Sequence, residues 1–245
     1  MSKFTILVVL FCGLMFCAPA AAAIVLTHTA DTDPVSEGWD GTNYDNPTGV
    51  AGTLASEVCW TFPNEANAKY HTPVASGAGS DGIFATNPTY ATLGWRVTAR
   101  FLYSNTEGHL NKHNFGYGID DGANSWGWDL NGGDKLTYND ANLGWTTLNV
   151  AYGTGWRDWV LTYTPDAGGS AVLTMDGAHV LTRTTSDAAS TTWDWLFPGS
   201  SGYNAPQATM DMGWASGTFE ILPEPATLAV LAVGGLLTLI RRRRS

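Results

Sequence analysis

Apolar and polar residues alternate along several segments after Gly94, and this alternation constrains the fold of the chain more than any other feature. In "GWRVTARFLYS" the residues Trp95, Val97, Ala99 and Phe101 occupy every second position. Side chains at that spacing lie on one face of a β-strand. The segments "RDWVLTYT" and "ASGTFEI" repeat the pattern, so we expect a sheet with one buried face.

Tight-turn signals separate these segments. Asn131-Gly132-Gly133 joins two short strand-like stretches, and Asp176-Gly177 joins two more. Such residues tolerate the positive φ angles that hairpin turns need. No stretch away from the two termini has a helical period. The pattern predicts an all-β domain over residues 24–221, built as an antiparallel sandwich or jelly roll.

The N-terminus has the composition of a secretory signal peptide. Lys3 gives a positive start, Phe4 to Phe16 is apolar, and small residues follow from Ala18. This order is typical of a cleaved leader, whereas the run is short for a retained membrane helix. We therefore expect residues 1–23 to be removed, and the domain to be exported.

Cysteine content limits the covalent links of the domain. Of the three cysteines, Cys12 and Cys17 lie in the leader, and only Cys59 remains. No intrachain disulfide is then available to the domain. Cys59 lies in the strand-like segment "EVCWTF", so we expect it in the core, and the sequence leaves its role open.

Charge narrows the class of partner. The whole chain carries −10, but residues 24–222 hold seven basic and 21 acidic side chains, which leaves about −14. A surface of this sign repels nucleic acid and anionic lipid. It suits neutral sugars, or cations that carboxylates hold.

The C-terminal tail is the most specific motif in the chain. Pro223-Glu224-Pro225 precedes an apolar run from Ala226 to Ile240, and the basic cluster comes at once afterwards: Arg241, Arg242, Arg243 and Arg244. As a helix, the run would span roughly 22 Å against a hydrocarbon core of ~30 Å. The arginines predict a cytoplasmic end, with the main domain on the other side of the membrane.

This tail resembles the PEP-CTERM sorting signal of bacteria that make exopolysaccharide. The resemblance covers residues 222–245 and rests on Pro223-Glu224-Pro225, the following apolar stretch and the arginine cluster. It implies transient membrane insertion by a short C-terminal transmembrane helix and recognition by an exosortase within the secretion machinery. Release or transfer to the cell envelope or the outside would follow. The alternative is a permanent tail anchor.

A second resemblance concerns the domain. The segment "WRDWVLTYTPDAGGSAVLTMDGAHV" resembles the laminin-G-like, concanavalin A-like lectin and glucanase modules. Its Trp, its apolar strand ending in Tyr and its Asp-Gly turn carry the likeness. The resemblance implies a lectin-like β-sandwich fold, and it implies function less strongly, because one fold serves many functions.

Catalytic motifs are hard to find. Retaining glucanases of this fold place paired carboxylates on one strand, with the carboxyl groups ~5 Å apart. The glutamates between leader and tail are Glu37, Glu57, Glu65, Glu107 and Glu220. None of them has a carboxylate two or four residues away in that pattern. We expect no catalytic residues, and a divergent glycoside hydrolase, in which Glu57 pairs with a distant Asp, is the alternative.

Clustered carboxylates and amides are candidates for a calcium site. Loop carboxylates and amides are ligands that Ca²⁺ prefers, and calcium is common at the rim of the modules that the domain resembles, but these residues also dominate ordinary turns. The candidates are Asp120, Asp121, Asp129, Asp134, Asn139 and Asp140.

Sugars stack on exposed aromatic rings. We expect Trp126 and Trp128 in the core. Trp193 and Trp195 are the candidate sugar platform, because loop-like sequence flanks this second pair, and burial in the core is the alternative for them.

These inferences combine into one interpretation. The sequence predicts an exported, non-catalytic surface or extracellular-matrix protein that is processed through its tail and contacts polysaccharide. The sequence requires no cofactor, and Ca²⁺ is the one candidate.

Overall fold

The computed structural model describes most of the predicted domain. The described residues are 22–39, 49–61, 88–105, 113–118, 124, 126–131, 134–165, 168–186, 197–202 and 210–222. One compact unit comprises Ile24 to Ile221. The predicted leader and tail lie outside the described residues, apart from Ala22, Ala23 and Leu222, so their boundaries stay predictions.

Strands account for nearly all the regular structure. The strands are β1 (Ala23–Thr29), β2 (Val50–Leu54), β3 (Glu57–Thr61), β4 (Trp95–Asn105), β5 (His113–Gly118), β6 (Trp128–Asn131), β7 (Lys135–Asp140), β8 (Gly144–Asn149), β9 (Trp156–Thr164), β10 (Ser170–Met175), β11 (Ala178–Thr184), β12 (Phe197–Gly202) and β13 (Met210–Ile221). Two short 3₁₀ helices, η1 (Pro34–Glu37) and η2 (Pro88–Thr92), complete the described elements.

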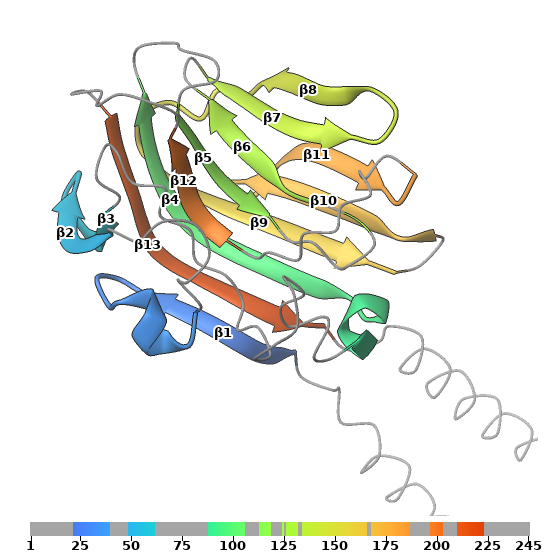
Figure 1. Cartoon of the computed structure of the whole chain (residues 1–245), viewed down its shortest axis with the longest axis horizontal. Helices are drawn as coiled ribbons and strands as arrows, with labels where there is room; N and C mark the ends of the chain where they lie inside the picture. Colours follow the sequence, from blue (N-terminus) through green and yellow to red (C-terminus); the bar gives the residue numbers. More distant parts are fainter. Residues whose placement is uncertain are drawn as a thin grey trace, which may run out of the picture. The chain divides into compact units, whose positions relative to one another are not determined.

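The strands form two sheets that pack into a sandwich (Figure 1). The larger has the order β11-β10-β9-β4-β13-β3-β2, and β1 also pairs with β13. The smaller has the order β12-β5-β6-β7-β8. Pairing is antiparallel for every pair whose register is known among the described strands, for example β4 with β13 and β7 with β8. The antiparallel sandwich expected from the sequence is confirmed.

Local sequence explains the succession β9-β10-β11. Alternate residues of β9 and β10 are buried, so each strand turns one face to the core. Asp176 and Gly177 both have positive φ, 50° and 78°, which is the geometry of a two-residue hairpin turn. The turn residues identified in the sequence therefore connect β10 to β11 as predicted.

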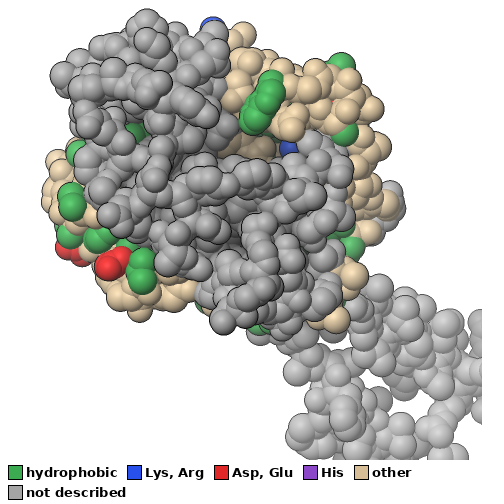
Figure 2. Space-filling view, viewed as in Figure 1, with side chains coloured by type: hydrophobic (Ala, Val, Ile, Leu, Met, Phe, Trp, Pro, Cys, Tyr) green, Lys and Arg blue, Asp and Glu red, His purple; other side chains and the backbone are tan. Residues whose placement is uncertain are grey.

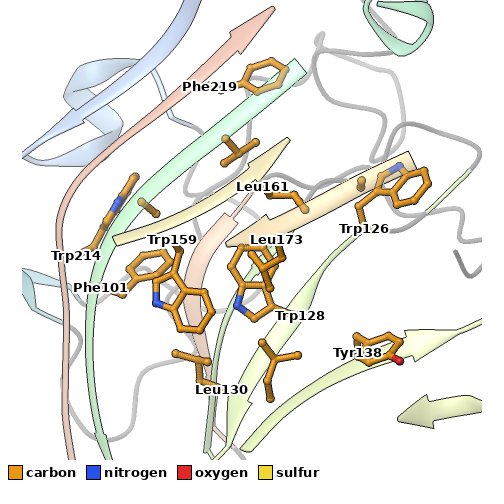
Figure 3. Close-up of a cluster of buried hydrophobic side chains, with 14 of the residues drawn as sticks. Phe101, Trp126, Trp128, Leu130, Tyr138, Trp159, Leu161, Leu173, Trp214 and Phe219 are labelled. Atoms are coloured by element: carbon orange, nitrogen blue, oxygen red, sulfur yellow. The ribbon is translucent and has the colours of Figure 1, made fainter. Parts of the chain in front are cut away.

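Large aromatic side chains fill the space between the sheets (Figure 3). Trp95, Val97, Ala99 and Phe101, which alternate along β4, are all buried, as the sequence predicts. Trp159 from β9 lies 5.8 Å from Trp128 of the smaller sheet, measured between ring centroids. This core supplies the stability that disulfides give to many exported domains. Cys59 is a buried free thiol, as expected.

The first and last strands are neighbours. β1 and β13 run in opposite directions, so Ile24 and Ile221 lie at the same end of the sandwich (Figure 1). No helix within the described residues is long and apolar enough to cross a membrane. The apolar run at 226–240 lies outside the described residues.

Candidate functional site

Several residues singled out in the sequence lie outside the described residues. They are Trp193, Trp195, Pro223, Glu224, Pro225, Arg241, Arg242, Arg243 and Arg244. The sugar platform at the Trp pair, the sorting motif and the arginine cluster therefore stay predictions.

The other tryptophan pair belongs to the core. Trp126 is 2% exposed and Trp128 is 4% exposed. The Trp126 ring packs 5.3 Å from that of Tyr163, and both tryptophans face the larger sheet (Figure 3). The expectation that these two residues fill the sandwich is confirmed, and they offer no surface to a sugar.

Two of the candidate calcium ligands have other partners. Asp134 Oδ1 accepts a hydrogen bond from the backbone N–H of Gly153 at 2.8 Å. Asp140 Oδ1 accepts from Asn142 N and Leu143 N at 2.8 and 3.0 Å, which closes the turn between β7 and β8. Within the described residues, no three His, Cys, Asp or Glu side chains come together as a metal site.

The remaining calcium candidates contribute no described side chain to such a site. Asp120 and Asp121 lie outside the described residues, and Asp129 is described only through its place in β6. The backbone carbonyl of Asn139 accepts a hydrogen bond from Arg183. Binding of Ca²⁺ therefore stays a prediction without a described ligand set.

Carboxylates distant in the sequence meet at one guanidinium. Arg100 donates from Nε to Glu57 Oε2 at 2.8 Å and from Nη1 to Asp158 Oδ1 at 2.9 Å. The hydrogen bond from Arg100 lowers the pKa of Glu57. A general acid in glycoside hydrolysis needs a raised pKa. Glu57 and an aspartate do come together in space, but this geometry keeps Glu57 ionised.

The side chain that is most suited to stack on a ligand is one that sequence reasoning missed. Trp145, on β8, is 71% exposed. Thr147 and Asn149 share its face of the strand and are also exposed, whereas Leu148 between them packs on the core. The alternation of "GWTTLN" was the available signal, but only the packing of Leu148 against the core shows that the Trp side of the strand is the outer one.

Strand β7 extends this surface with polar side chains. The register pairs Asn139 with Trp145, Thr137 with Thr147, and Lys135 with Asn149. Leu136 and Tyr138 alternate with them and are buried, so the three β7 residues lie on the outer face. We call these six residues the hairpin surface: Lys135, Thr137, Asn139, Trp145, Thr147 and Asn149. It combines one exposed indole ring with amide, hydroxyl and ammonium groups.

The hairpin surface stands on a well-supported element. Arg183 of β11 is 4% exposed and lies over the ring of Tyr138, with its guanidinium carbon 5.0 Å from the ring centroid. The same guanidinium donates a hydrogen bond to the carbonyl of Asn139. Asn142 in the turn donates from Nδ2 to the carbonyl of Ser186 at 3.1 Å. These contacts tie the hairpin to the end of β11, which gives Trp145 a defined position.

Hydrophobic side chains elsewhere on the surface do not suggest a second site. In the described part of the face that Figure 2 shows, hydrophobic side chains are scattered and do not form one large patch. Other large exposed examples in the described part of the chain are Ile24, Val35, Val50, Val58 and Leu143. Single exposed hydrophobics are ordinary in folded proteins and need no ligand. Trp145 differs because it is aromatic and has polar neighbours on a sheet face.

The described strands define an antiparallel β-sandwich. No protein-family model and no curated protein matches the chain. The receptor binding domain of botulinum neurotoxin D is similar, with a TM-score of 0.53 and 10% identity over 86% of this chain and 53% of that one. A structure of the serotype D ligand binding domain in complex with N-acetylneuraminic acid is similar too, at a TM-score of 0.52 and 10% identity, over 87% of this chain and 51% of that one. The chain thus spans about half the length of these neurotoxin domains.

The matches with two carbohydrate-active proteins cover more of those proteins' own length. A carbohydrate esterase from Shiga toxin-encoding bacteriophage phi24B matches with a TM-score of 0.55 and 13% identity, over 82% of this chain and 100% of that one. The Crh5 transglycosylase in complex with NAG matches with a TM-score of 0.50 and 15% identity, over 84% and 89%. At these identities the likeness concerns the fold alone.

Proposed function

We propose that this chain is an exported, non-catalytic glycan-binding protein of the cell envelope or extracellular matrix, delivered there through its C-terminal sorting signal. Three features support the proposal. They are the leader at residues 1–23, the PEP-CTERM-like tail at residues 222–245, and a β-sandwich with an exposed tryptophan on a polar sheet face. Membrane insertion is a transient stage, and exosortase is the partner that ends it.

One observation carries the glycan-binding part of the proposal, namely Trp145 beside the polar residues of the hairpin surface. An indole ring presents a flat apolar face on which the C–H face of a pyranose ring can stack. The amide of Asn139 and the hydroxyl of Thr147 provide hydrogen-bond donors and acceptors for sugar hydroxyls. The acidic domain also favours an uncharged partner over a polyanion.

The structural neighbours are compatible with this function. They include a domain in complex with N-acetylneuraminic acid, a carbohydrate esterase and a transglycosylase in complex with NAG. Carbohydrate recognition therefore recurs on sandwiches of this general architecture, although fold alone does not assign it.

Glycan binding is tested with the processed protein, purified from the culture medium or the envelope and applied to a polysaccharide panel. Replacement Trp145→Ala is expected to weaken binding at least about tenfold, which corresponds to ~1.4 kcal/mol. Val58→Ala removes another exposed hydrophobic side chain, on the other sheet, and serves as the matched control. Equal binding by Trp145→Ala and the unaltered protein would remove the hairpin surface from the proposal.

Sorting is tested separately by mass spectrometry of the C-terminus. The proposal expects the exported form to lack Arg241 to Arg244, and expects Glu224→Ala to leave the full-length chain in the membrane fraction. A cell-surface protein that retains all four arginines would instead support a permanent anchor.

A glycan-modifying enzyme is the second candidate. The meeting of Glu57 and Asp158 at Arg100, and the carbohydrate-active neighbours, favour this reading. The lowered pKa of Glu57 argues against its acting as an acid. Incubation with the glycan it binds separates the candidates, since release of smaller products that is lost in Glu57→Gln would make the chain an enzyme.

A further inference from the structure

Lys135 differs from the other described Lys and Arg side chains of the domain. Every described arginine has an oxygen partner: Arg96 pairs with Glu220, Arg100 with Glu57 and Asp158, Arg157 with Asp176, and Arg183 donates to the carbonyl of Asn139. In the described part of the chain, the side chain of Lys135 makes neither an ion pair nor a hydrogen bond. Its ammonium group is therefore available to a ligand.

Lys135 lies on the hairpin surface together with Trp145. The register of β7 with β8 pairs Lys135 with Asn149, so their Cβ atoms are ~5 Å apart. Asn149 is exposed and Lys135 is partly exposed, whereas Leu136 and Leu148 next to them face the core. Trp145 precedes Asn149 on the same face of β8 and lies roughly 13 Å away along the strand.

The pair of Lys135 and Asn149 is suited to an anionic group of a ligand. The lysine ammonium carries three N–H donors and no acceptor, and the asparagine amide adds two N–H donors. A hydrogen bond from an ammonium group to an anionic oxygen is roughly twice as strong as one between neutral groups. The pair therefore favours a carboxylate or a sulfate over a sugar hydroxyl.

The length of the hairpin surface decides which sugar carries the anion. The indole of Trp145 offers a stacking face for one pyranose ring. A separation of roughly 13 Å along β8 exceeds the length of such a ring. The acidic group at Lys135 and Asn149 therefore belongs to a different sugar from the one that stacks on Trp145, and the ligand contains more than one sugar.

The charge of the domain limits how many anions the ligand can carry. Residues 24–222 carry about −14, so a glycan with a charge on every sugar meets a repulsive field. The attraction to Lys135 is local, because charges in physiological salt are screened over ~8 Å. The carboxylates at the two ends of β7, Asp134 and Asp140, each accept hydrogen bonds from backbone N–H groups through Oδ1. A single anion beside Lys135 is therefore attracted, whereas a polyanion is repelled along most of its length.

We propose that the hairpin surface binds a glycan with isolated acidic groups, in which Lys135 and Asn149 hold the carboxylate or sulfate of one sugar while another sugar stacks on Trp145. This inference rests on the proposed glycan-binding function and adds the acidic substituent to it. Lys135 then determines specificity, and Trp145 supplies affinity for sugar rings whether or not they are charged.

Matched tetrasaccharides test this proposal. The probes are tetrasaccharides of glucose, galactose or mannose in a neutral form, in forms with one carboxylate or one sulfate on each sugar in turn, and in a form with a carboxylate on every sugar. Calorimetry on the processed protein gives the affinities. For the backbone that binds best, one acidic group is expected to raise affinity about fivefold over the neutral form, and high salt should reduce this gain. The fully carboxylated form should bind more weakly than the singly acidic one.

Variants of Lys135 distinguish the cation from the tryptophan. Lys135→Gln should abolish the gain from the acidic group and leave affinity for the neutral form within about twofold, whereas Lys135→Arg should keep the gain. The matched control Thr53→Glu makes the same change of net charge on β2, an edge strand of the larger sheet, and should bind like the unaltered protein.

Each outcome separates the two proposals. Equal affinity for the neutral and singly acidic forms of every backbone, tighter binding of the fully carboxylated form, a gain that persists in Lys135→Gln, or an equal loss in Thr53→Glu would overturn the role of Lys135 and leave glycan binding intact. Absence of binding to every probe and to the polysaccharide panel would overturn both.

Discussion

Arg183 of β11 lies with its guanidinium carbon 5.0 Å from the ring centroid of Tyr138 on β7, and this contact joins the edge strand of the larger sheet to the strand next to the edge of the smaller one. The arginine is buried and also donates to the carbonyl of Asn139, one of the hairpin-surface residues. A cation in this position gains from the electron-rich ring face and from the carbonyl, which together offset its loss of hydration. The contact thus couples the stability of the sandwich edge to the position of the candidate binding surface.

Replacement of Arg183 by alanine should therefore affect both properties. The loss of a buried cation–π contact and hydrogen bond, together with the space left behind, is expected to lower the free energy of unfolding by about 3 kcal/mol. Chemical denaturation measures this change, and affinity for the bound glycan should fall as well. His179→Ala, an exposed change on the same strand, should lie within ~0.5 kcal/mol of the unaltered protein. Equal stability of Arg183→Ala and His179→Ala would contradict the assigned role.

The sequence and the structure agree where the pattern is local. Alternation along β4 and β9 predicted which tryptophans are buried, and Asp176-Gly177 predicted a hairpin, because side-chain period and turn geometry depend on near neighbours. Other strands, among them β1 and β8, were not predicted. Their pairing with distant partners organises them, and a single sequence does not contain that register.

The same limit applies to the candidate site. Trp145 could be noticed as an aromatic residue, but only the packing of Leu148 against the core shows that it lies on the outer face. Arg183 and Tyr138 are 45 positions apart, and Arg100 and Glu57 are 43 apart, so no spacing rule would join them. Among the calcium candidates, Asp140 accepts hydrogen bonds within its own turn, whereas the partner of Asp134, Gly153, is 19 positions away.

A buried histidine should make the domain sensitive to acid. His28 Nδ1 lies 2.7 Å from Glu37 Oε2, its Nε2 lies 3.1 Å from the carbonyl oxygen of Trp214, and its ring stacks on the Trp214 indole at 3.7 Å between centroids. Two oxygen neighbours suit the imidazolium, and Glu37 raises the pKa, but desolvation is the larger effect and lowers the pKa of His28.

The lowered pKa of His28 sets the sign of the pH dependence of stability. The pKa of a histidine in the unfolded chain is ~6.5, and below that pH the unfolded chain binds a proton that native His28 resists. The contribution of His28 to the free energy of unfolding is therefore present above about pH 6.5 and is lost as the pH falls through the lower native pKa. Denaturation midpoints at pH 7.5 and 5.5 measure the loss. His28→Gln should reduce it, and Glu37→Gln should steepen it, because removal of the carboxylate lowers the His28 pKa further. A domain that gains stability over this interval would refute the assignment.

Gly217 tests the fit between β13 and β4. A Cβ atom at this position would lie 2.8 Å from the backbone oxygen of Thr98 and 2.9 Å from Trp214 Nε1. Backbone cannot yield cheaply in a paired strand, so Gly217→Ala is expected to cost about 2 kcal/mol of unfolding free energy. Gly155→Ala provides the control, since no atom lies within 4 Å of its added Cβ. That variant should be neutral or gain up to ~1 kcal/mol, because alanine restricts the unfolded chain. Similar stabilities of the two variants would show that β13 shifts to accept the methyl group.

The end of β13 limits where the chain can be cut in the proposed sorting step. Phe219 and Ile221 are buried, and Ile221 still pairs with Trp95 of β4, so the sandwich needs its chain up to this residue. The sorting motif begins two positions later, at Pro223. Cleavage at or after the motif should then leave the unfolding free energy of the domain unchanged within ~0.5 kcal/mol, whereas a chain that ends at Ser216 loses the buried side chains of Phe219, Glu220 and Ile221 and should not fold. Mass spectrometry of the exported protein is expected to find its C-terminus beyond Leu222. A stable exported form that ends inside β13 would mean that the strand is not the structural boundary of the domain, and that the sorting motif is not where processing occurs.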